Sequence, residues 1–485
     1  MRPLIQEINT THSPETLVGR LRGEDGVVLL RSQEFDSPQA RHSFVAANPF
    51  LKLRSYGSLC QIDSTEGRRR QFGNPWSVLD SLMARYEILD EVDLPFPLGG
   101  CFGFWGYDLK NFVEARLPRR AENDLELPDC AVGFHDSLIA FDHRLDKTWI
   151  VSTGLCADGS RNETRARQVA DWWRERLASD QIDDAHPASS RKPPASRSIE
   201  SNLSRAEFVD IVRRAQRYIR AGDIYQVNLS HRLNVALDID GWELYSRLTA
   251  VSPAPFSAWL DCGDFQIASS SPERFLKLSG GHIQTRPIKG TRPRSADPDE
   301  DARFSYELQS SEKERAELVM ITDLMRNDLG RVCEYGSVQA PDILRLERYA
   351  QVQHLVSTVE GRLRRDVTHF SAFASCFPGG SITGAPKIRA MEIIDELEPV
   401  TRGPYTGCIG YLGFNRESQL NIAIRTAVHT QGRAWFHAGA GIVADSDPAA
   451  EYDETLAKAA GFLAALNLPA AASAPKKQTE TRSND

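Results

Sequence analysis

Lys289 and Glu273 are the two residues of this chain whose types and spacing could support covalent chemistry. Lys289 lies in the pentapeptide Pro287–Thr291, sixteen residues after Glu273. A neutral lysine amine is a nucleophile, and a nearby cation such as Mg²⁺, or removal from water, favours that neutral form. A protonated glutamate beside it could act as the general acid that helps to expel a hydroxyl group. The alternative is a structural ion pair in which both side chains stay charged.

A glycine turn between Glu273 and Lys289 decides whether the two side chains meet. Phe275–Leu278 and His282–Arg286 have the composition of strands, and the glycines between them are typical of a hairpin. If the turn is centred on Gly280, Lys289 lies diagonal to Glu273 on the same face. A change of register by one residue would place them on opposite faces, so the predicted contact depends on this turn.

Two Glu-x-x-Glu pairs occur further along the chain, at Glu314/Glu317 and Glu451/Glu454. The first pair lies in the strongly helical segment Ser311–Ile321, where a spacing of three residues puts both carboxylates on one face. Mg²⁺ prefers few direct carboxylates, several waters and oxygens from a substrate. One direct ligand from each pair would meet that preference. For either pair taken alone, the alternative is an exposed charged helix face.

Glycine-rich turns at Pro378–Lys387 and Gly439–Gly441 offer backbone amides that could bind an anion. The first turn lacks the Gly-Lys-Ser/Thr ending of a phosphate loop, but it leads into a helix expected to begin near Pro386. The second follows an expected strand, Trp435–Ala438. A tight turn without a ligand is the alternative for both. Further polar residues are candidates for binding: Arg425, Lys458, His354 and Tyr411.

Local signals predict a helix and then a strand after residue 203. Ser204–Glu207 is a capping box, apolar residues follow at helical spacing, and Gly222 is a typical helix stop. Ile224–Leu229 then alternates like a strand, with the polar Gln226 facing away from the apolar side. Gln226 therefore faces either a site or a solvated sheet surface.

Composition excludes several classes of protein. The chain has 485 residues, of which 41% are hydrophobic and 26% charged, as in a globular protein, and its net charge of -8 argues against a nucleic-acid binder. No run of 18 apolar residues occurs, and the first residues lack a signal-peptide core, so we expect no membrane span. Eight scattered cysteines without a Cys-x-x-Cys motif are typical of reduced thiols, and we therefore expect a cytoplasmic protein.

Changes in composition divide the sequence into four parts. Residues 1–178 have the pattern of one α+β unit, and residues 179–203 that of a linker or mobile loop, poor in apolar residues. Residues 204–466 carry every candidate for catalysis named above. The tail, residues 467–485, is small and polar, and we expect it to be disordered.

Taken together and in this order, the motifs resemble those of the chorismate-utilising enzymes, which include anthranilate, aminodeoxychorismate, isochorismate and salicylate synthases. The resemblance covers most of residues 205–465. The similar stretches are Ala221–Leu229, Ser271–Phe275, Pro287–Arg294, Glu314–Arg331, Gly379–Lys387, Gly410–Gly413, Ile424–Thr426 and Gly439–Glu454. The family fold that it implies is α+β, a layered core of large antiparallel sheets with surrounding helices and an active site in a cleft. Residues 1–178 look like the family's N-terminal companion domain.

The resemblance also implies roles for individual residues. Glu317 and Glu454 would bind Mg²⁺ directly, with Glu314 and Glu451 as indirect or water-mediated partners, and the metal would hold the ring carboxylate of chorismate. Glu273 would be the acid/base for the C4 hydroxyl group. Further residues would bind or surround the substrate: Gly290, Thr291, His354, Gly380, Thr383, Tyr411, Arg425, Ala440, Gly441 and Lys458.

Two positions discriminate among the reactions of this family. Gln226 stands where isochorismate and salicylate synthases have a water-activating lysine, and an amide has no base that titrates near pH 7. Lys289 stands where anthranilate synthases have alanine and many aminodeoxychorismate synthases have lysine. The segment Ser252–Ser257 also resembles the latter class. The resemblance therefore implies amination of chorismate at C4 through a covalent Lys289 intermediate, with anthranilate synthesis as the alternative.

Partners and regulators follow from the same resemblance. No glutaminase module is recognisable, so ammonia would come from a separate glutamine amidotransferase subunit or from free ammonium. A tryptophan pocket of this family, either regulatory or structural, would involve Ser32, Arg41, Pro255, Phe256 and Ser257. A catalytically silent subunit is a different class of explanation. The complete acidic pairs, together with Glu273 and Lys289, argue against it.

Overall fold

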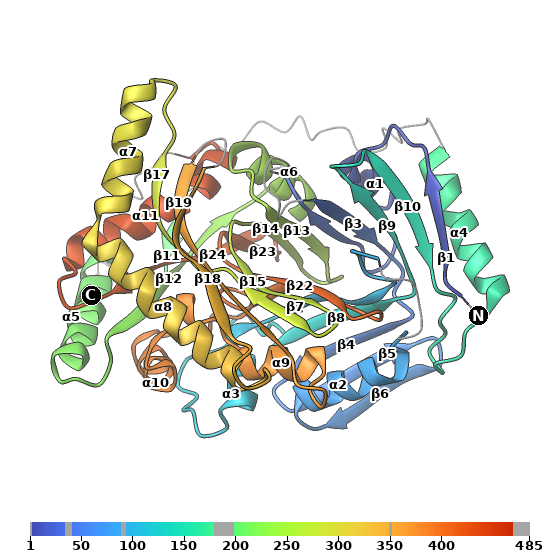
Figure 1. Ribbon diagram of the computed structural model, residues 1–485, viewed down its shortest axis with the longest axis horizontal. Helices are drawn as coiled ribbons and strands as arrows, with labels where there is room; N and C mark the ends of the chain where they lie inside the picture. The colour runs from blue at the N-terminus through green and yellow to red at the C-terminus, as the bar shows by residue number, and fades with distance from the viewer. Residues whose placement is uncertain (1, 34–40, 89–93, 179–197, 349–351, 469–485) are drawn as a thin grey trace, which may run out of the picture.

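The computed structural model describes residues 2–33, 41–88, 94–178, 198–348 and 352–468. Two antiparallel sheets of twelve strands each form its centre, and helices lie around them (Figure 1). The expected α+β class, with a layered core of large antiparallel sheets, is confirmed. Most of the expected disordered tail and most of the expected linker lie outside the described residues. Every helix within the described ranges is too short or too polar to traverse a bilayer.

The first sheet contains the strand that carries Gly439–Gly441. Its order is β1 (Leu4–Ile8), β10 (Lys147–Ser152), β9 (Ser137–Asp142), β3 (His42–Ala46), β2 (Val28–Arg31), β13 (Phe256–Asp261), β14 (Gln266–Ser271), β23 (Thr426–Thr430), β24 (Arg433–Ile442), β12 (Gln226–Ala236) and β11 (Glu200–Ser201), with β20 (Gly384–Ala385) also paired to β12.

The second sheet contains the strand that carries Lys289. Its order is β17 (Ile288–Pro293), β19 (Val352–Arg362), β16 (His282–Thr285), β15 (Arg274–Ser279), β22 (Glu417–Ile422), β21 (Cys408–Gly413), β7 (Gly100–Trp105), β8 (Cys130–His135), β4 (Leu51–Tyr56), β5 (Leu59–Ser64) and β6 (Gly67–Phe72), with β18 (Gln339–Arg348) also paired to β19.

The helices lie at the two ends of the sheets and along their outer faces. They are α1 (Pro14–Arg20), α2 (Pro75–Tyr86), α3 (Lys110–Val113), α4 (Glu163–Ala178), α5 (Arg205–Arg220), α6 (Gly241–Val251), α7 (Pro298–Ser310), α8 (Glu312–Gly330), α9 (His369–Cys376), α10 (Lys387–Leu397) and α11 (Pro448–Ala465). Figure 1 shows α5, α7, α8 and α11 gathered at one end of the molecule and α1 and α4 at the other.

Strands from both halves of the sequence alternate within each sheet. In the first sheet β2 pairs with β13, and in the second β7 pairs with β21, so residues 1–178 and 204–466 share two continuous ladders of hydrogen bonds. The predicted boundary at residues 179–203 therefore separates the two segments along the sequence, whereas both sheets cross it.

Alternate residues of a strand face opposite sides of its sheet, and this alternation determines which residues pack between the two sheets and which pack under the helices. In β3, Phe44 and Ala46 face the second sheet and pack with residues such as Ile409, whereas Val45 faces α1 and α4 on the outer side. On the outer face of the second sheet, a third core packs α2, α8 and α9 against strands such as β15. Both sheets are thus covered on their outer faces and packed against each other on their inner faces.

The local predictions around residue 204 are confirmed. Helix α5 begins with the predicted capping box, in which the hydroxyl group of Ser204 accepts from the amide of Glu207 and the carboxylate of Glu207 accepts from the amide of Ser204. Gly222, at a φ of 84°, follows the helix end at Ala221. The expected strand begins at Gln226, whose side chain is buried, and α10 begins at Lys387, next to the expected Pro386.

The predicted register of the hairpin before Lys289 is wrong by one residue. Ser279 pairs with His282 and Leu278 with Ile283, so the turn is the two-residue loop Gly280–Gly281 rather than a turn centred on Gly280. The pairing of β15 with β16 ends at Gln284, and the next strand, β17, pairs with β19 instead. The hairpin therefore does not place Lys289 beside Glu273.

Candidate active site

A β-bulge sets the direction of the Lys289 side chain. In the pairing of β17 with β19 the register shifts between Lys289 and Thr291, and Gly290 adopts a φ of 67° that favours glycine. A Cβ atom at residue 290 would lie 2.5 Å from Leu308 Cδ1, so no larger residue fits there. The bulge in Lys289–Thr291, rather than the hairpin, thus sets the direction of the Lys289 side chain.

Glu273 lies close enough to Lys289 for the two charges to interact, as the sequence predicted, although the hairpin does not cause it. The carboxylate is buried, and it accepts hydrogen bonds from Ser381 and from the backbone of Ile288. Burial raises the pKa of Glu273 to about 7, although the hydrogen bond from Ser381 and the charge of Lys289 oppose the rise. A carboxyl group with this pKa can both give and take a proton near neutral pH.

The two acidic pairs face each other from α8 and α11, with lysines between them. Lys289 Nζ lies 3.4 Å from Glu317 Oε2, and Lys458 Nζ lies 2.7 Å from Glu454 Oε1. Lys289 also acts electrostatically on Glu454, which places its ammonium group between the two helices. Lys313, 3.9 Å from a carboxylate oxygen of Glu451, links α8 to α11 in the same way.

The surroundings shift the pKa values of Glu314, Glu451 and Glu454 in different directions. Burial raises the pKa of Glu314, and the neighbouring Glu317 raises it further. Burial likewise raises the pKa of Glu451, to which Glu454 adds. Burial alone would raise the pKa of Glu454, but the nearby lysines, chiefly Lys458, hold it below its ordinary value.

Strand β24 contributes the Gly439–Gly441 segment to the same place. The prediction of a turn there is wrong, because the strand continues to Ile442 and the segment pairs with Asn228–Ser230 of β12. Lys289 Nζ lies 3.6 Å from the position that a Cβ atom of Gly441 would take, and Gln226 Nε2 lies only 2.5 Å from it. Lys458 also donates to the carbonyl oxygen of Gly439, at 3.0 Å. The pairing of β23 with β24 ends at Phe436, so β23 does not extend along this part of β24. One edge of this segment pairs with β12, and the other is not paired to β23.

His354 lies beside the bulge and is neutral at physiological pH. Its Nδ1 atom is 2.9 Å from the hydroxyl group of Thr291 and 3.3 Å from the carbonyl oxygen of Gly290. Burial lowers the pKa of His354 to about 4, and the nearby Arg425 contributes to the decrease. The structure therefore brings together the predicted residues Gly290, Thr291, His354 and Arg425.

The predicted glycine-rich loop lies against the start of β12. Thr383 accepts from the amide of Asn228 through its carbonyl oxygen, at 2.8 Å, and its hydroxyl group donates to the carbonyl oxygen of Gly379. A Cβ atom at Gly380 would lie 2.4 Å from Leu324 Cδ2 of α8. The loop thus packs between α8 and β12. Ser381 within it is the hydrogen-bond donor to Glu273, a role that the sequence analysis did not assign.

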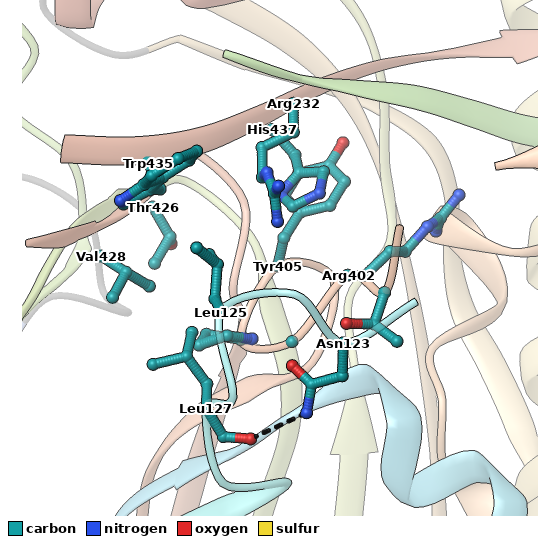
Figure 2. A pocket seen from close by; sticks show the side chains of 13 residues that line it. Asn123, Leu125, Leu127, Arg232, Arg402, Tyr405, Thr426, Val428, Trp435 and His437 are labelled. Carbon is teal, nitrogen blue, oxygen red and sulfur yellow. Dashed lines mark hydrogen bonds between the residues drawn. The ribbon is translucent and has the colours of Figure 1, made fainter. Parts of the chain in front are cut away.

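Tyr411 lies apart from these residues, in the core between the two sheets. Its ring packs on Phe44 and Phe102, at centroid distances of 5.2 and 5.5 Å. The hydroxyl group of another tyrosine, Tyr405, lies 2.9 Å from the Cβ position of Gly439, and its ring is stacked on His437 (Figure 2). Both tyrosines occur in the short segment Tyr405–Tyr411, and no periodicity in the sequence indicates which of them lies near the candidate site.

The residues predicted for a tryptophan pocket do share a cavity, with one exception. Ser32, Pro255, Phe256 and Ser257 line a cavity of about 30 Å³ together with Tyr411. Arg41 is not among the lining residues and pairs with Asp142 at 2.6 Å. As the side chains stand, the cavity has room for about two water molecules, which is less than an indole ring needs.

The donor set of the acidic pairs suits a hard cation, although it is not a ready-made metal site. Among the described residues no three His, Cys, Asp or Glu side chains are grouped as metal ligands. Instead, two carboxylates from each helix face one another across lysine side chains. Mg²⁺ takes one or two protein carboxylates and fills its shell with water and substrate oxygens, so it does not require a closed protein cage.

The solved structure of anthranilate synthase component I from Streptococcus pneumoniae TIGR4 is similar to this one. The TM-score is 0.77 at 31% sequence identity, over 88% of this chain and 93% of that chain. The class defined by this fold and by the site between α8 and α11 is that of the chorismate-utilising enzymes.

Sequence comparisons agree with this class. The family model described as chorismate binding enzyme matches residues 35–464. Anthranilate synthase component 1 from Acetivibrio thermocellus is 39% identical over 94% of this chain and 92% of its own length. Aminodeoxychorismate synthase component 1 from Escherichia coli (strain K12) is 40% identical over 92% of this chain and 94% of its own length. The chain belongs to the chorismate-binding enzyme family and is an enzyme that acts on chorismate.

The raised pKa of Glu273 predicts how its replacement changes stability with pH. Because the folded-state pKa of about 7 exceeds the ordinary value of 4.5, the stabilising effect of the neutral form is complete below 4.5 and is lost as the pH rises through 7. Glu273→Gln cannot ionise. We therefore expect it to gain on the order of 3 kcal/mol over the wild type between pH 4.5 and 8.

Thermal unfolding of both proteins at several pH values tests this prediction. Glu66→Gln, at an exposed position, is the control and should follow the wild type throughout. A stability difference between Glu273→Gln and the wild type that does not vary with pH would show that folding does not raise the pKa of Glu273.

Proposed function

We propose that this protein is aminodeoxychorismate synthase component I, which converts chorismate and ammonia to 4-amino-4-deoxychorismate. The observation that carries the proposal is the position of Lys289 between the two acidic pairs and near the buried Glu273. Alanine at this position, as in sequences of the anthranilate synthase type, would offer no nucleophile.

The proposed reaction has two displacement steps. Lys289 attacks C2 of chorismate through its neutral amine as the C4 hydroxyl group leaves, and Glu273 donates the proton that converts the leaving group to water. Ammonia then attacks C4 and expels the lysine amine from C2. Ammonia is consumed, water is released, and the enolpyruvyl group stays on the ring. Gln226, buried beside Lys289, contributes no base that could direct water to C2.

The same site would position the substrate through its two carboxylates. Glu317 and Glu454, supported by Glu314 and Glu451, would hold a Mg²⁺ ion, which when bound would neutralise these carboxylates and bind the ring carboxylate. The edge of the Gly439–Gly441 segment that is not paired to β12 would receive a substrate carboxylate. The further binding residues would be Arg425, Lys458, Gly380 and Thr383, with the neutral His354 near the ring.

We further propose that a separate glutamine amidotransferase subunit supplies the ammonia in the cytoplasm, and that the product serves p-aminobenzoate and folate synthesis. The alternative function is that of anthranilate synthase component I, which forms anthranilate and pyruvate. It is supported by a relative of that name at nearly the same identity as the aminodeoxychorismate synthase relative.

Product analysis distinguishes these two functions. Purified protein incubated with chorismate, Mg²⁺ and ammonium at mildly alkaline pH should form aminodeoxychorismate without pyruvate, identified by chromatography and mass. Anthranilate with an equal amount of pyruvate would contradict the proposal and support the alternative. If free ammonium gives no product, adding a glutaminase subunit and glutamine separates a strict need for the partner from a silent protein.

In the same assay Lys289→Ala should abolish aminodeoxychorismate formation or shift the product toward anthranilate. In the wild type the Lys289 amine would occupy C2 and thereby direct ammonia to C4. The variant lacks this amine. Lys147→Ala, an exposed lysine that pairs with Glu7, is the matched control and should behave as the wild type. Unchanged aminodeoxychorismate output from Lys289→Ala would exclude the covalent role.

The proposed metal ligands predict a different kind of loss. Glu317→Gln and Glu454→Gln keep the size of the side chain and remove the charge, so each should lose at least about tenfold in Mg²⁺-dependent turnover. The measurement is the initial rate against Mg²⁺ concentration, with Glu312→Gln on the exposed face of α8 as the control. Full activity of both variants at low Mg²⁺ would remove these residues from the metal site.

A further inference from the structure

The loop between α9 and α10 carries Ser381, the hydrogen-bond donor to Glu273. It leaves α9 at Cys376 and enters α10 at Lys387. Ser381 lies near its centre, within the short 3-10 helix Gly380–Ile382. We refer to residues 377–386 below as the glycine loop.

A buried lysine joins the two ends of the glycine loop. The ammonium group of Lys387 donates to the carbonyl oxygen of Cys376 at 3.0 Å. It also pairs with Asp328 Oδ2 of α8 at 2.5 Å, and the side chains of Lys387 and Asp328 are only 8% and 1% exposed. The ion pair therefore closes the loop and attaches it to the helix that carries Glu314 and Glu317.

This ion pair does not have the form that best stabilises a fold. Removing two charges from water is costly, and their attraction offsets that cost only when the remaining polar atoms are also satisfied. Asp328 Oδ1 is buried and has no hydrogen-bond partner in the part of the chain that the structure describes. Replacing such a pair with apolar side chains of similar size is often neutral for stability or stabilising. Holding the loop in one position accounts for the pair better than stability does.

A second buried cation fixes the centre of the loop. Arg402 donates to the carbonyl oxygen of Ile382 at 3.1 Å and to that of Asn228 on β12 at 2.7 Å. Its other donors bind both carboxylate oxygens of Glu398 and a threonine hydroxyl group. Because all five N–H groups of the guanidinium group are thereby used, the backbone next to Ser381 is held against β12.

The carboxyl group of Glu273 is bonded from two sides. The amide of Ile288, the residue before Lys289, donates to it from β17, and the hydroxyl group of Ser381 donates to it from the glycine loop. An amide N–H can only donate, whereas a hydroxyl group can turn and either donate or accept. Ser381 can therefore keep a hydrogen bond to Glu273 both when the carboxyl group is ionised and when it carries a proton.

This property suits a group that gives up and regains a proton in each turnover. A general acid must stay within hydrogen-bond reach of the group that it protonates, and a misplacement of about 1 Å can lower a rate about a hundredfold. Without the hydroxyl group of Ser381, only the amide of Ile288 would restrain the carboxyl group of Glu273 by a hydrogen bond. The carboxyl group could then rotate away from the substrate.

We infer that Ser381 is a positioning residue of the reaction, which holds the Glu273 carboxyl group toward the substrate, and that the Asp328–Lys387 ion pair positions Ser381 by closing the glycine loop. The inference rests on the proposed function, because it takes Glu273 as the acid/base. In this role neither Ser381 nor Lys387 needs to touch the substrate.

Steady-state kinetics of Ser381 variants test the contact with Glu273. Ser381→Ala should lower kcat about tenfold, the effect of losing one hydrogen bond to a charged group, and should change the KM for chorismate by less than about twofold. Ser381→Thr retains the hydroxyl group and should keep most of the activity. Ser81→Ala, at an exposed position on α2, is the matched control. An unchanged kcat in Ser381→Ala would overturn the inference.

The pH dependence of the rate gives a readout that a merely structural role would not move. Burial raises the pKa of Glu273, and the hydrogen bond from Ser381 and the charge of Lys289 oppose the rise. Because a general acid must be protonated, the fall of kcat/KM at alkaline pH follows the pKa of Glu273 when ammonia is saturating. Ser381→Ala removes a bond to the ionised form and should move that fall to higher pH. A lower kcat with an unshifted profile would contradict the inference.

A double replacement tests the ion pair without leaving a buried charge unpaired. Lys387→Met combined with Asp328→Asn removes both charges at nearly constant volume, so the Tm should stay close to that of the wild type. The kcat should nevertheless fall at least about tenfold, because the loop is no longer closed. Asp328→Asn alone keeps an acceptor for Lys387 and is a milder second variant with the same expected direction. Lys52→Met with Asp25→Asn, at an exposed ion pair, is the matched control.

A combined variant shows whether the ion pair acts through Ser381. If it does, adding Ser381→Ala to the double replacement should lower kcat little further, because the hydrogen bond to Glu273 is already lost. Losses that multiply would show that the two sites act independently and would overturn the inference. A wild-type kcat in both Asp328→Asn and the double replacement would also overturn it.

These experiments separate the inference from the proposed function. If the wild type converts chorismate to anthranilate, the proposed function fails, and the same variants still test the inference through total chorismate consumption. If the wild type consumes no chorismate, amide hydrogen exchange of residues 377–387 decides: faster exchange in the double replacement supports closure by the ion pair, and unchanged exchange refutes it. If aminodeoxychorismate forms normally and Ser381→Ala matches the wild type, the proposed function stands and the inference is refuted.

Discussion

Electrostatic repulsion among four carboxylates is the constraint on which the site depends. Glu314 and Glu317 on one helix face Glu451 and Glu454 on another, and burial makes the negative charges of Glu314 and Glu451 costly. Lysines from a strand and from both helices lie between them and offset the repulsion. A site of this kind cannot be built on a mobile loop, because small displacements would leave buried charges unpaired.

The interleaved sheets provide the required rigidity. Lys289 belongs to the second sheet and the Gly439–Gly441 segment of β24 to the first, so their contact exists only while the two sheets keep their relative position. That position is fixed by the apolar core between the sheets, to which both halves of the sequence contribute. The N-terminal segment, which carries no catalytic candidate, thus acts on the site through the packing of this core.

The sequence predicted the parts of the fold that depend on short-range chemistry. The capping box at Ser204, the glycine turn before His282 and the start of α10 all follow from local hydrogen bonding and backbone conformation. The strand order could not be predicted from such local signals. Pairing between strands that are far apart in the sequence depends on surfaces that no short stretch of sequence contains. The alternation of the two halves within each sheet is of this kind.

The candidate site, too, has features that the sequence predicted and features that only the folded chain shows. Helical spacing was sufficient to put each acidic pair on one face, but only the folded chain shows that the two pairs oppose each other. Glu273 and Lys289 interact as expected, yet the assumed turn was wrong, and the bulge at Gly290 with the pairing of β17 to β19 accounts for the position of Lys289. Ser381 and Tyr405 had no distinguishing pattern, because their roles arise from tertiary contacts alone.

The bulge at Gly290 makes the strand pairing independent of the side chain at position 289. The backbone of residue 289 pairs with Leu355 whatever side chain it bears, and the conformational requirement falls on the next residue, a glycine. A change of side chain at position 289 therefore leaves the strand pairing undisturbed. Under the proposed function, one substitution at this position would change the product while the scaffold stays the same, so overall sequence similarity would be a poor guide to the product.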